Sequence, residues 1–355
     1  RYKYKKVQKN ENQSKYNKFI SNLENNGIGV NKIFKNGNFL GVEVTQFTHS
    51  DLNTLNEIIQ QAKGESDLEE EVLTNFKIVD LSVVENYDTT FEDQSDSIYI
   101  RNKVKGFNTS TRFNFRPFLA AREGFFKGAL LLENDTEYLF SDNLIFSSNL
   151  KLSVWNNFDD LTIPPRDTFP AQVRSDIKDY LRAFDDGLVI GRAQLDFFRS
   201  LKTNHHIMLS AGIFEEMYNG IGFEYLYFPP DKNFAVGFET FQIFKRDYGL
   251  QFGMLDYKNQ TSHVNFYHRN YGLIPFDTKI SYGEYLAGDI GATIELSRNL
   301  RNGVEFGVFA TFTDVSSKEF GEGSFDKGIF FNIPIVGNLV SYTWHPLTKD
   351  PGAKL

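Results

Sequence analysis

Apolar and polar residues alternate along most of the chain after residue 97. In 304–312 every second position is apolar, and the positions between are mostly small or polar, with Phe309 as the exception. Because successive side chains of a strand point to opposite faces, this stretch predicts a strand with one apolar face. The same alternation recurs in 144–154, 191–197 and 290–297.

Segments of this kind predict about 12–15 antiparallel strands within 91–355, most of them roughly 8–12 residues long. They are 98–105, 113–121, 127–140, 144–155, 188–201, 205–216, 221–228, 234–245, 248–256, 263–269, 278–286, 290–300, 303–312, 328–335 and 339–344. The segment 156–187 differs, because it contains Pro164 and Pro165 and a helical pattern at 173–184. We expect a long loop or an inserted helix there.

Residues 1–90 show helical periodicity in two places. Tyr16, Phe19, Ile20 and Leu23 are spaced for one face of a helix, and Ser50 is a good N-cap for a second helix. Strand signals lie at 2–7, 30–34, 39–44 and 76–84, with an Asn-Gly hairpin turn between the second and third. The order β-α-β-β-α-β predicts a small ferredoxin-like α+β module, followed by an acidic linker at 88–96.

The strand pattern after residue 97 fits either a membrane β-barrel or a soluble β-sandwich. The strands are long for a sandwich, whose strands typically have about 5–6 residues. Tyr225, Tyr227, Tyr282 and Tyr285 fall near strand ends, as expected for aromatic girdles at a membrane interface. The strand faces opposite the apolar ones carry charges, which a wet lumen accepts more readily than a dry core. The pattern therefore favours the membrane barrel.

Composition narrows the functional classes. The 355 residues include no cysteine, which excludes disulfides, cysteine catalysis and thiolate metal sites. Net charge is −8, which argues against a nucleic-acid partner. Aromatic residues make up 15% of the chain, and this abundance agrees with strands that meet a membrane interface.

Eight short motifs stand out between about 160 and 355. They are Val173-Arg174-Ser175-Asp176 with Tyr180, AGIFEEM at 211–217, GFEYLY at 222–227, Lys245-Arg246-Asp247-Tyr248, YLAGDIG at 285–291, Thr313-Asp314-Val315, FGEGSFDKG at 320–328 and WHPLTKD at 344–350. In this order they resemble the YjbH family of Gram-negative outer-membrane proteins for exopolysaccharide and capsule secretion. FGEGSFDKG is the most specific of them.

The resemblance implies an outer-membrane β-barrel with periplasmic α/β modules that serves polysaccharide secretion and not catalysis. It implies a polysaccharide, outer-membrane lipids, and small lipoprotein and periplasmic proteins of the same system as partners. The module at 1–90 is then expected in the periplasm. Family members are longer, so we expect this chain to match the C-terminal part of their length. Bacterial barrels often end in an aromatic residue, whereas this chain ends at Leu355, so we expect a last strand to be missing from it.

Charged residues on the polar strand faces are the candidates to line a lumen and contact the polymer. They are Arg192, Glu215, Glu224, Glu239, Glu295 and Glu305. Their inward direction depends on register, since a slip of one residue turns every side chain of a strand to the other face.

The loop motif offers a second candidate, made of Gly321, Glu322, Gly323, Asp326 and Lys327. One interpretation is a loop that folds into the lumen or contacts glycan. The other is a glycine-dependent turn that only fixes a hairpin.

No catalytic, metal or cofactor motif is predicted. His205 and His206 are adjacent, so on a strand they point to opposite faces and cannot share a metal. The chain has no GxSxG, phosphate-binding loop or GxGxxG motif.

Three hypotheses remain open at this point. The first is an outer-membrane secretion component that passes or guides a polysaccharide through or along the barrel. The second is a surface glycan-binding barrel that anchors capsule without a continuous pore. The third is an envelope glycosidase, because Glu215, Glu216, Glu224 and Glu239 could supply a carboxylate pair.

Overall fold

A computed structural model shows that the chain is mainly β, as the alternation predicts. It describes residues 12–46, 52–78, 81–101, 106–118, 127–141, 143–159, 161–162, 173–174, 176–229, 232–300, 304–314, 326–336 and 340–344. Within these residues, no helix is both long and apolar enough to cross a membrane.

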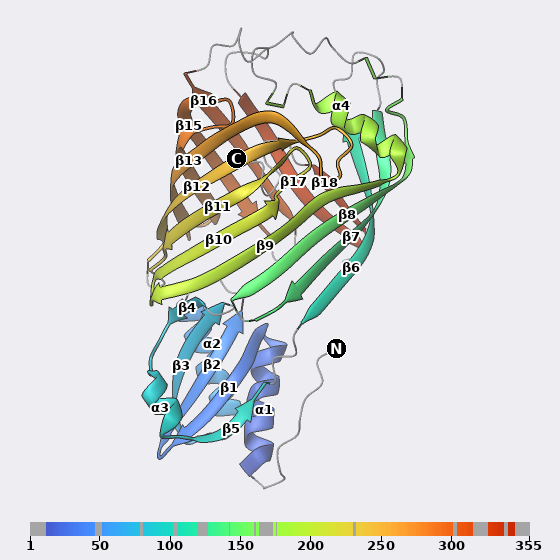
Figure 1. Cartoon of the computed structure of the whole chain (residues 1–355). Coiled ribbons are helices and arrows are strands. Elements are labelled where there is room, and N and C mark those ends of the chain that lie inside the picture. Colours follow the sequence, from blue (N-terminus) through green and yellow to red (C-terminus); the bar gives the residue numbers. More distant parts are fainter. Residues whose placement is uncertain are drawn as a thin grey trace. The chain divides into compact units, whose positions relative to one another are not determined.

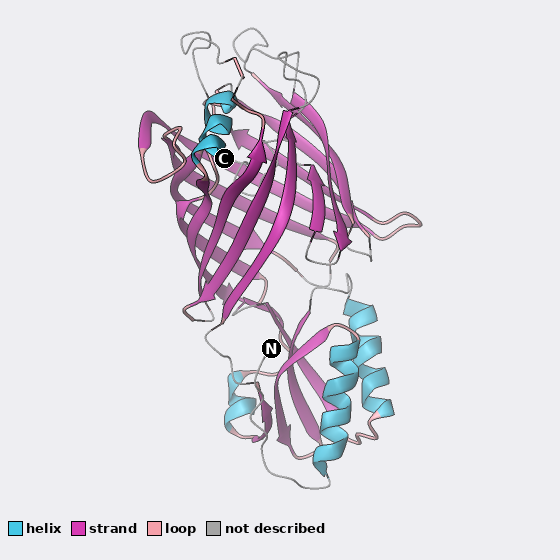
Figure 2. Cartoon of the chain, turned by 90° about the vertical axis from the view of Figure 1, so that its right-hand side faces the viewer, coloured by secondary structure: helices cyan, strands magenta, loops and turns pink. Residues whose placement is uncertain are grey.

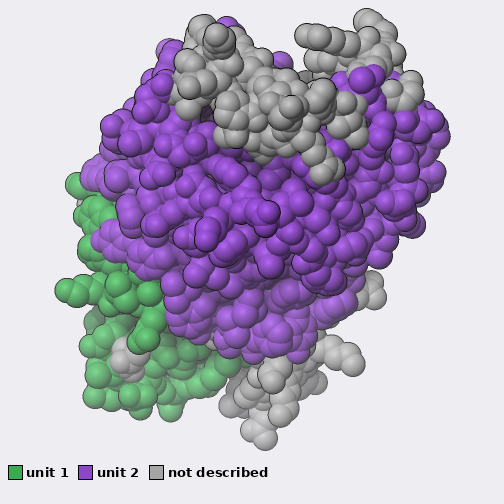
Figure 3. All heavy atoms as spheres, turned by 45° about the horizontal axis from the view of Figure 1, so that its top comes forward, with its two compact units in different colours: residues 1–106, 198–207, 227–232 green, residues 107–197, 208–226, 233–355 purple. Residues whose placement is uncertain are grey.

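The chain divides into two compact units (Figure 3). Unit 1 comprises Arg1–Gly106, Phe198–Ile207 and Tyr227–Lys232. Unit 2 comprises Phe107–Phe197, Met208–Leu226 and Asn233–Leu355.

Unit 1 contains a five-stranded sheet with two longer helices on one face (Figure 2). Its elements are α1 (Asn12–Asn25), β1 (Ile28–Asn36), β2 (Phe39–Gln46), α2 (Leu52–Glu65), β3 (Glu71–Ile78), β4 (Leu81–Val84), α3 (Thr89–Asp93) and β5 (Asp96–Ile100). The apolar stripe of α1 packs into the core of this unit, where Phe19 and Leu23 are fully buried. Gly37 turns the β1–β2 hairpin with a φ of 58°, as the Asn-Gly signal predicts.

From α1 to β3 the elements follow in the predicted order, α-β-β-α-β, but the strands of the sheet are not arranged as in a ferredoxin-like fold. In that fold the first strand lies between the two strands that flank the second helix. Here β2 and β3 flank α2 and pair directly in parallel, from Phe39 opposite Glu71 to Val44 opposite Phe76. The sheet order is β4-β3-β2-β1-β5, which leaves no place for an inserted strand. The predicted strand at 2–7 lies outside the described residues.

Three shorter predictions in unit 1 also fail. The strand predicted at 98–105 as the first of the barrel region is β5, which pairs with β1 in the small sheet. The single strand predicted at 76–84 is a hairpin of β3 and β4. The acidic linker predicted at 88–96 contains helix α3, because Asp88 caps it: the Asp88 carboxylate accepts a hydrogen bond from the Phe91 amide at 3.2 Å.

The large sheet, β6 to β18, contains the remaining strands (Figure 1). They are β6 (Phe107–Phe118), β7 (Lys127–Leu139), β8 (Leu144–Asn156), β9 (Leu188–Lys202), β10 (His205–Ile213), β11 (Tyr218–Tyr227), β12 (Phe234–Arg246), β13 (Met254–Asn270), β14 (Phe276–Glu284), β15 (Ile290–Asn299), β16 (Glu305–Thr313), β17 (Asp326–Val336) and β18 (Val340–Trp344). These thirteen strands fall within the predicted range of about 12–15.

The strand order of the large sheet closes on itself as a barrel. β18 pairs with β6 in parallel, through Val340 opposite Phe113 and Ser341 opposite Asn114. An odd number of strands joined in up-and-down hairpins brings the first and last strands together in parallel, so this pairing is a consequence of the strand count. Single-chain bacterial barrels usually have an even number of strands, which close antiparallel.

The segment 157–187 contains α4 (Ile177–Arg182) followed by the short 3₁₀ helix η1 (Ala183–Asp186). The helical pattern predicted at 173–184 is therefore present in a shorter form. Tyr180, Leu181 and Phe184 are buried in a core with Leu131 of β7 and Ile243 of β12. Helices α4 and η1 thus pack on the large sheet.

One predicted pair of strands is wrong. The segments 248–256 and 263–269 were expected as separate strands, but β13 is a single strand of 17 residues. The preceding stretch 247–253 is a loop that lies against the start of β9. There the Ile190 amide donates to the Leu250 carbonyl at 3.2 Å, and the Gln251 side chain donates to the Leu188 carbonyl at 2.7 Å.

Candidate functional site

The strands of the large sheet have two chemically different faces. On β16, Phe306, Val308 and Phe312 are exposed, while Phe309 between them is buried. The same exposed apolar side is formed by Val264 and Phe266 of β13, Ile280 and Tyr282 of β14, and Ile294 and Leu296 of β15. We call this side the outer face and the opposite side the inner face.

A polar band occupies the inner face of β11 to β15. We define it as Glu224, Glu239, His263, Tyr267, Lys279 and Glu295. His263 Nδ1 lies 3.6 Å from Glu239 Oε1. The Lys279 ammonium lies 5.3 Å from the centre of the Tyr267 ring. Glu295 is directly opposite Lys279 in the β14–β15 register. The structure therefore brings together three of the six residues predicted from sequence.

Hydroxyl and amide groups surround this band. Ser281 donates to the Asn265 side-chain oxygen at 2.6 Å, and the hydroxyls of Thr293 and Thr311 are 2.8 Å apart. The Tyr285 ring meets the His263 ring edge-on, with centroids 4.6 Å apart. Aromatic faces, carboxylates, an ammonium and hydroxyls on one surface are the groups that hydrogen-bond and stack with sugars.

A second group, the motif cluster, consists of Val173, Arg174, Asp176, Tyr180, Glu215, Glu216, Tyr218, Lys245, Arg246 and Tyr248. Three of the sequence motifs, far apart along the chain, meet here. The structure thus shows that residues of these three motifs contact one another, which their sequence positions did not indicate.

Arg246 is the centre of the motif cluster and is 0% exposed. Its Nη1 donates to the carbonyls of Ile190, Glu215 and Glu216 at 2.8, 2.9 and 3.0 Å. Its Nη2 donates to the Gln251 carbonyl at 2.9 Å. A planar guanidinium presents five donors in a fixed fork, so one side chain joins β9, the β10–β11 turn and the 247–253 loop.

The segment 157–187 is attached to β12 through the same cluster. The Tyr180 hydroxyl donates to the Arg246 carbonyl at 2.6 Å. Lys245 lies 2.6 Å from Asp176, and both side chains are buried. Lys245 also donates to Asp176 Oδ1 at 2.7 Å, and the Tyr248 hydroxyl donates to Asp176 Oδ2, the oxygen nearest Lys245, at 3.0 Å. A buried ion pair and two tyrosine hydrogen bonds therefore connect Asp176 and Tyr180 of this segment to the end of β12 and the residues that follow it.

The adjacent glutamates of the β10–β11 turn are also held by cations. The two terminal nitrogens of Arg174, Nη2 and Nη1, donate to the two carboxylate oxygens of Glu215 at 2.7 and 3.2 Å. Glu216 lies 2.6 Å from both Arg116 of β6 and Lys151 of β8. Glu215, which we predicted to contact a polymer, is thus ion-paired within the motif cluster. Nothing in the sequence indicated that Arg116 and Lys151 bind Glu216.

The other predicted residues belong to neither group. Arg192 donates from Nε to the Phe214 carbonyl at 3.3 Å. Glu305 is half-buried at the start of β16, opposite Asn299 and Asn332 in register. Of the loop motif, Gly321, Glu322 and Gly323 lie outside the described residues. Asp326 and Lys327 begin β17, where they pair with Thr311 and Ala310.

No metal centre is evident in the described part of the chain, where no three His, Cys, Asp or Glu residues are grouped to hold an ion. His205 and His206 lie next to each other at the start of β10.

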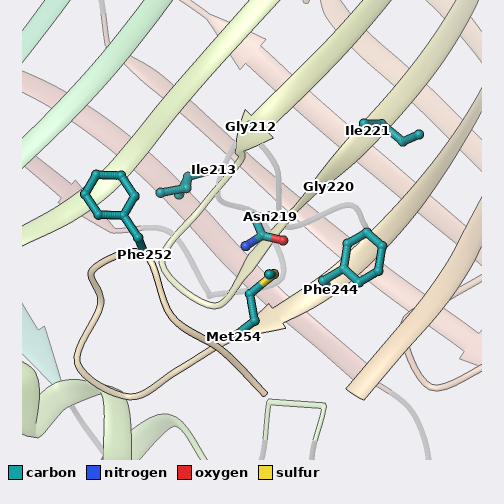
Figure 4. Close-up of a pocket in the computed structure, with 8 residues that line it drawn as sticks. All are labelled: Gly212, Ile213, Asn219, Gly220, Ile221, Phe244, Phe252 and Met254. Carbon is teal, nitrogen blue, oxygen red and sulfur yellow. The ribbon is translucent and has the colours of Figure 1, made fainter. Parts of the chain in front are cut away.

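The outer face carries a shallow apolar groove of about 330 Å³ at the ends of β10 to β13 (Figure 4). Ile213, Ile221, Phe244, Phe252 and Met254 surround it, with Asn219 and two glycines between them. A Cβ on Gly212 or Gly220 would lie 2.3 or 2.2 Å from a backbone carbonyl oxygen of the neighbouring strand. The close approach of the strands therefore keeps side chains out of these two positions.

Comparison with known proteins adds a family. The family model described as exopolysaccharide biosynthesis protein YbjH matches residues 3–355, so the chain belongs to the YjbH family. A curated relative, the uncharacterized lipoprotein YjbH of Escherichia coli strain K12, is 30% identical over 245 residues. That match covers 66% of this chain and 35% of the relative, so the chain spans about a third of that protein's length. The resemblance seen in the sequence is confirmed at the level of the family.

Proposed function

We propose that this member of the YjbH family is an outer-membrane component of exopolysaccharide or capsule secretion. The large sheet crosses the membrane as a β-barrel, and a polysaccharide is guided along its polar inner face. Lipids cover the outer face. Small lipoprotein and periplasmic proteins of the same system are the expected partners, and the chain has no catalytic role.

The observation that carries this proposal is the opposite chemistry of the two faces. In a soluble sandwich the apolar side of each sheet is buried in the core. Here Phe306, Val308 and Phe312 of β16 are exposed, and Gly307, Phe309 and Thr311, which alternate with them, lie on the opposite, inner face. Apolar residues outside and polar residues inside are the arrangement of a transmembrane barrel.

Loop lengths support an orientation. At one end of the large sheet the connections are short, at 140–143, 203–204, 271–275 and 300–304. At the other end they are mostly longer, at 119–126, 157–187, 247–253 and 314–325. Barrels of this class have short periplasmic turns and longer external loops. We therefore assign the segment 157–187 to the external end, and the chain enters from the N-terminal module, at β6, on the periplasmic side.

One observation favours the second hypothesis, a surface glycan-binding barrel without a continuous pore. The core around Tyr180 and Phe184 covers part of the inner face, and the motif cluster latches it there. A polymer could then bind the interior without passing through it. Of the four glutamates of the glycosidase hypothesis, Glu215 and Glu216 are both bound by cations, which leaves Glu224 and Glu239 as its remaining carboxylate pair.

The absence of cysteine allows a direct test by single-cysteine labelling. Thr311→Cys on the inner face and Val308→Cys on the outer face of β16 form a matched pair. In reconstituted vesicles we expect a charged, membrane-impermeant thiol reagent to label Thr311→Cys at least tenfold faster than Val308→Cys. A lipid-soluble maleimide should show the reverse preference.

Exopolysaccharide should slow labelling at Thr311→Cys and leave Val308→Cys unchanged. Equal labelling at both positions by the charged reagent would contradict the membrane barrel. If labelling is unequal but exopolysaccharide does not change it, the membrane barrel is supported and binding of the polymer to its interior is contradicted.

A further inference from the structure

Unit 1 contains a polar pocket of about 290 Å³ that the proposed function does not use. It lies between α1, the end of β1 and the segment that joins α2 to β3. Lys15, Tyr16, Lys35, Asp67, Glu69 and Glu70 contribute to its lining. Ligand pockets have volumes of roughly 300–1,000 Å³, so this one suits one or two small rings.

Glu70 is held in place by two donors from different elements. Its Oε1 accepts a hydrogen bond from the Tyr16 hydroxyl at 2.9 Å and from the Lys35 ammonium at 2.5 Å. These hydrogen bonds outweigh the effect of burial and lower the pKa of Glu70 to about 2. The carboxylate is therefore charged at neutral pH and stays so well below pH 4.

Lys15 is held on the other side of the pocket. Its ammonium donates to the Asp67 carbonyl at 3.1 Å, and its side chain is exposed. Asp67 has a φ of 53°, which is uncommon for a residue other than glycine and turns its carbonyl at the end of α2. Lys15 keeps two further N–H groups for a ligand, because an ammonium has three donors.

The charges of the pocket are mixed and nearly balanced. Its lining includes two lysines, Lys15 and Lys35, and three acidic residues, Asp67, Glu69 and Glu70. The small negative excess disfavours an anionic ligand, and two ammonium groups disfavour a metal ion. Polar lining disfavours an apolar ligand. What remains is a neutral molecule with several hydroxyls, each of which donates one hydrogen bond and accepts others.

We infer that this pocket binds one or two neutral sugar residues of the exopolysaccharide through neighbouring hydroxyls. The hydroxyls donate to the carboxylates of Glu70 and Asp67 and accept from the ammonium groups of Lys15 and Lys35. This inference rests on the proposed function, and it adds a glycan site in the N-terminal module, separate from the inner face of the large sheet.

The test uses fragments of exopolysaccharide from the source bacterium, released by mild acid and separated into neutral and acidic fractions. Binding to the full chain in detergent is followed by saturation-transfer NMR titration. We expect the neutral fraction to bind. Lys15→Met and Glu70→Gln should each weaken that binding at least fivefold.

Lys18→Met is the matched control, because Lys18 is exposed on the same helix but does not line the pocket. It should bind like the wild type. Because the Glu70 carboxylate keeps its charge in mild acid, the difference in binding between the wild type and Glu70→Gln should be the same at pH 7 and pH 5.

Five outcomes would overturn the inference. Equal weakening by Lys15→Met and Lys18→Met would show a non-specific charge effect. Binding of the acidic fraction alone, or displacement of sugar by a pentalysine peptide but not by neutral fragments, would show a different ligand class. If Glu239→Gln abolishes binding of the neutral fraction and Lys15→Met does not, the pocket is not the glycan site, and the proposed function is unaffected. No binding of any fragment, together with polymer-insensitive labelling of Thr311→Cys, would remove both.

Discussion

Replacing Arg246 with methionine is expected to lower the free energy of unfolding by about 3–5 kcal/mol, the usual cost of breaking a buried charged network. Four carbonyl groups lose their donor at once, those of Ile190, Glu215, Glu216 and Gln251. Each buried acceptor left without a partner costs about 1–3 kcal/mol, and relaxation of the loop recovers part of the sum. Urea unfolding of the detergent-folded chain, followed by tryptophan fluorescence, measures the loss.

Arg269→Met is the matched control for this prediction. Arg269 also lies in the large sheet and pairs with Asp277 at 2.6 Å, but its side chain is 42% exposed. Removing an exposed ion pair costs at most about 1 kcal/mol. If both variants lose the same small amount of stability, Arg246 does not hold the strands together as we describe.

Lys245→Met is expected to lower the free energy of unfolding by about 3 kcal/mol and to loosen the segment 157–187. The substitution leaves the Asp176 carboxylate buried, with the Tyr248 hydroxyl as its remaining partner among the contacts described above. Adding Asp176→Asn removes that charge and keeps a hydrogen-bonding side chain. The double variant should regain at least half of the loss, with a coupling energy of about 2 kcal/mol between the two positions.

Limited proteolysis reports on the segment itself. Lys245→Met should be cleaved within 157–187 at least tenfold faster than the wild type. Lys258→Met, which replaces an exposed lysine of β13, should show wild-type stability and cleavage. Additive losses in the double variant would mean that Lys245 and Asp176 do not act as a pair.

The strands of the large sheet were predictable because their signal is local. Alternation of side chains between two faces is visible within a few residues, as it is in β16. β13 was misjudged for the same reason. Its outward positions Lys258, Gln260 and Ser262 are polar, so the apolar half of the alternation disappears there and the segment looks like a loop.

The predictions that were wrong concern contacts between residues far apart along the chain. The sequence of neither strand alone predicts that β2 and β3 pair directly in parallel, with α2 as their connection. Glu215 was placed on the inward side of its strand, yet Arg174, which binds it, lies 41 residues away. Arg246 stands between Lys245 and Asp247 at the end of a strand, and nothing in this run of charges predicts the four carbonyl acceptors that the fold brings to it.

The most direct test of the account is the current through the purified chain in planar lipid bilayers, recorded with and without exopolysaccharide. We predict that the wild type conducts rarely, because 157–187 is latched to the large sheet, and that Lys245→Met conducts far more often. Exopolysaccharide should block the current of both forms. If both forms insert into lipid and remain silent, or conduct with no response to the polymer, then the interior is not a path for polysaccharide and the account is contradicted.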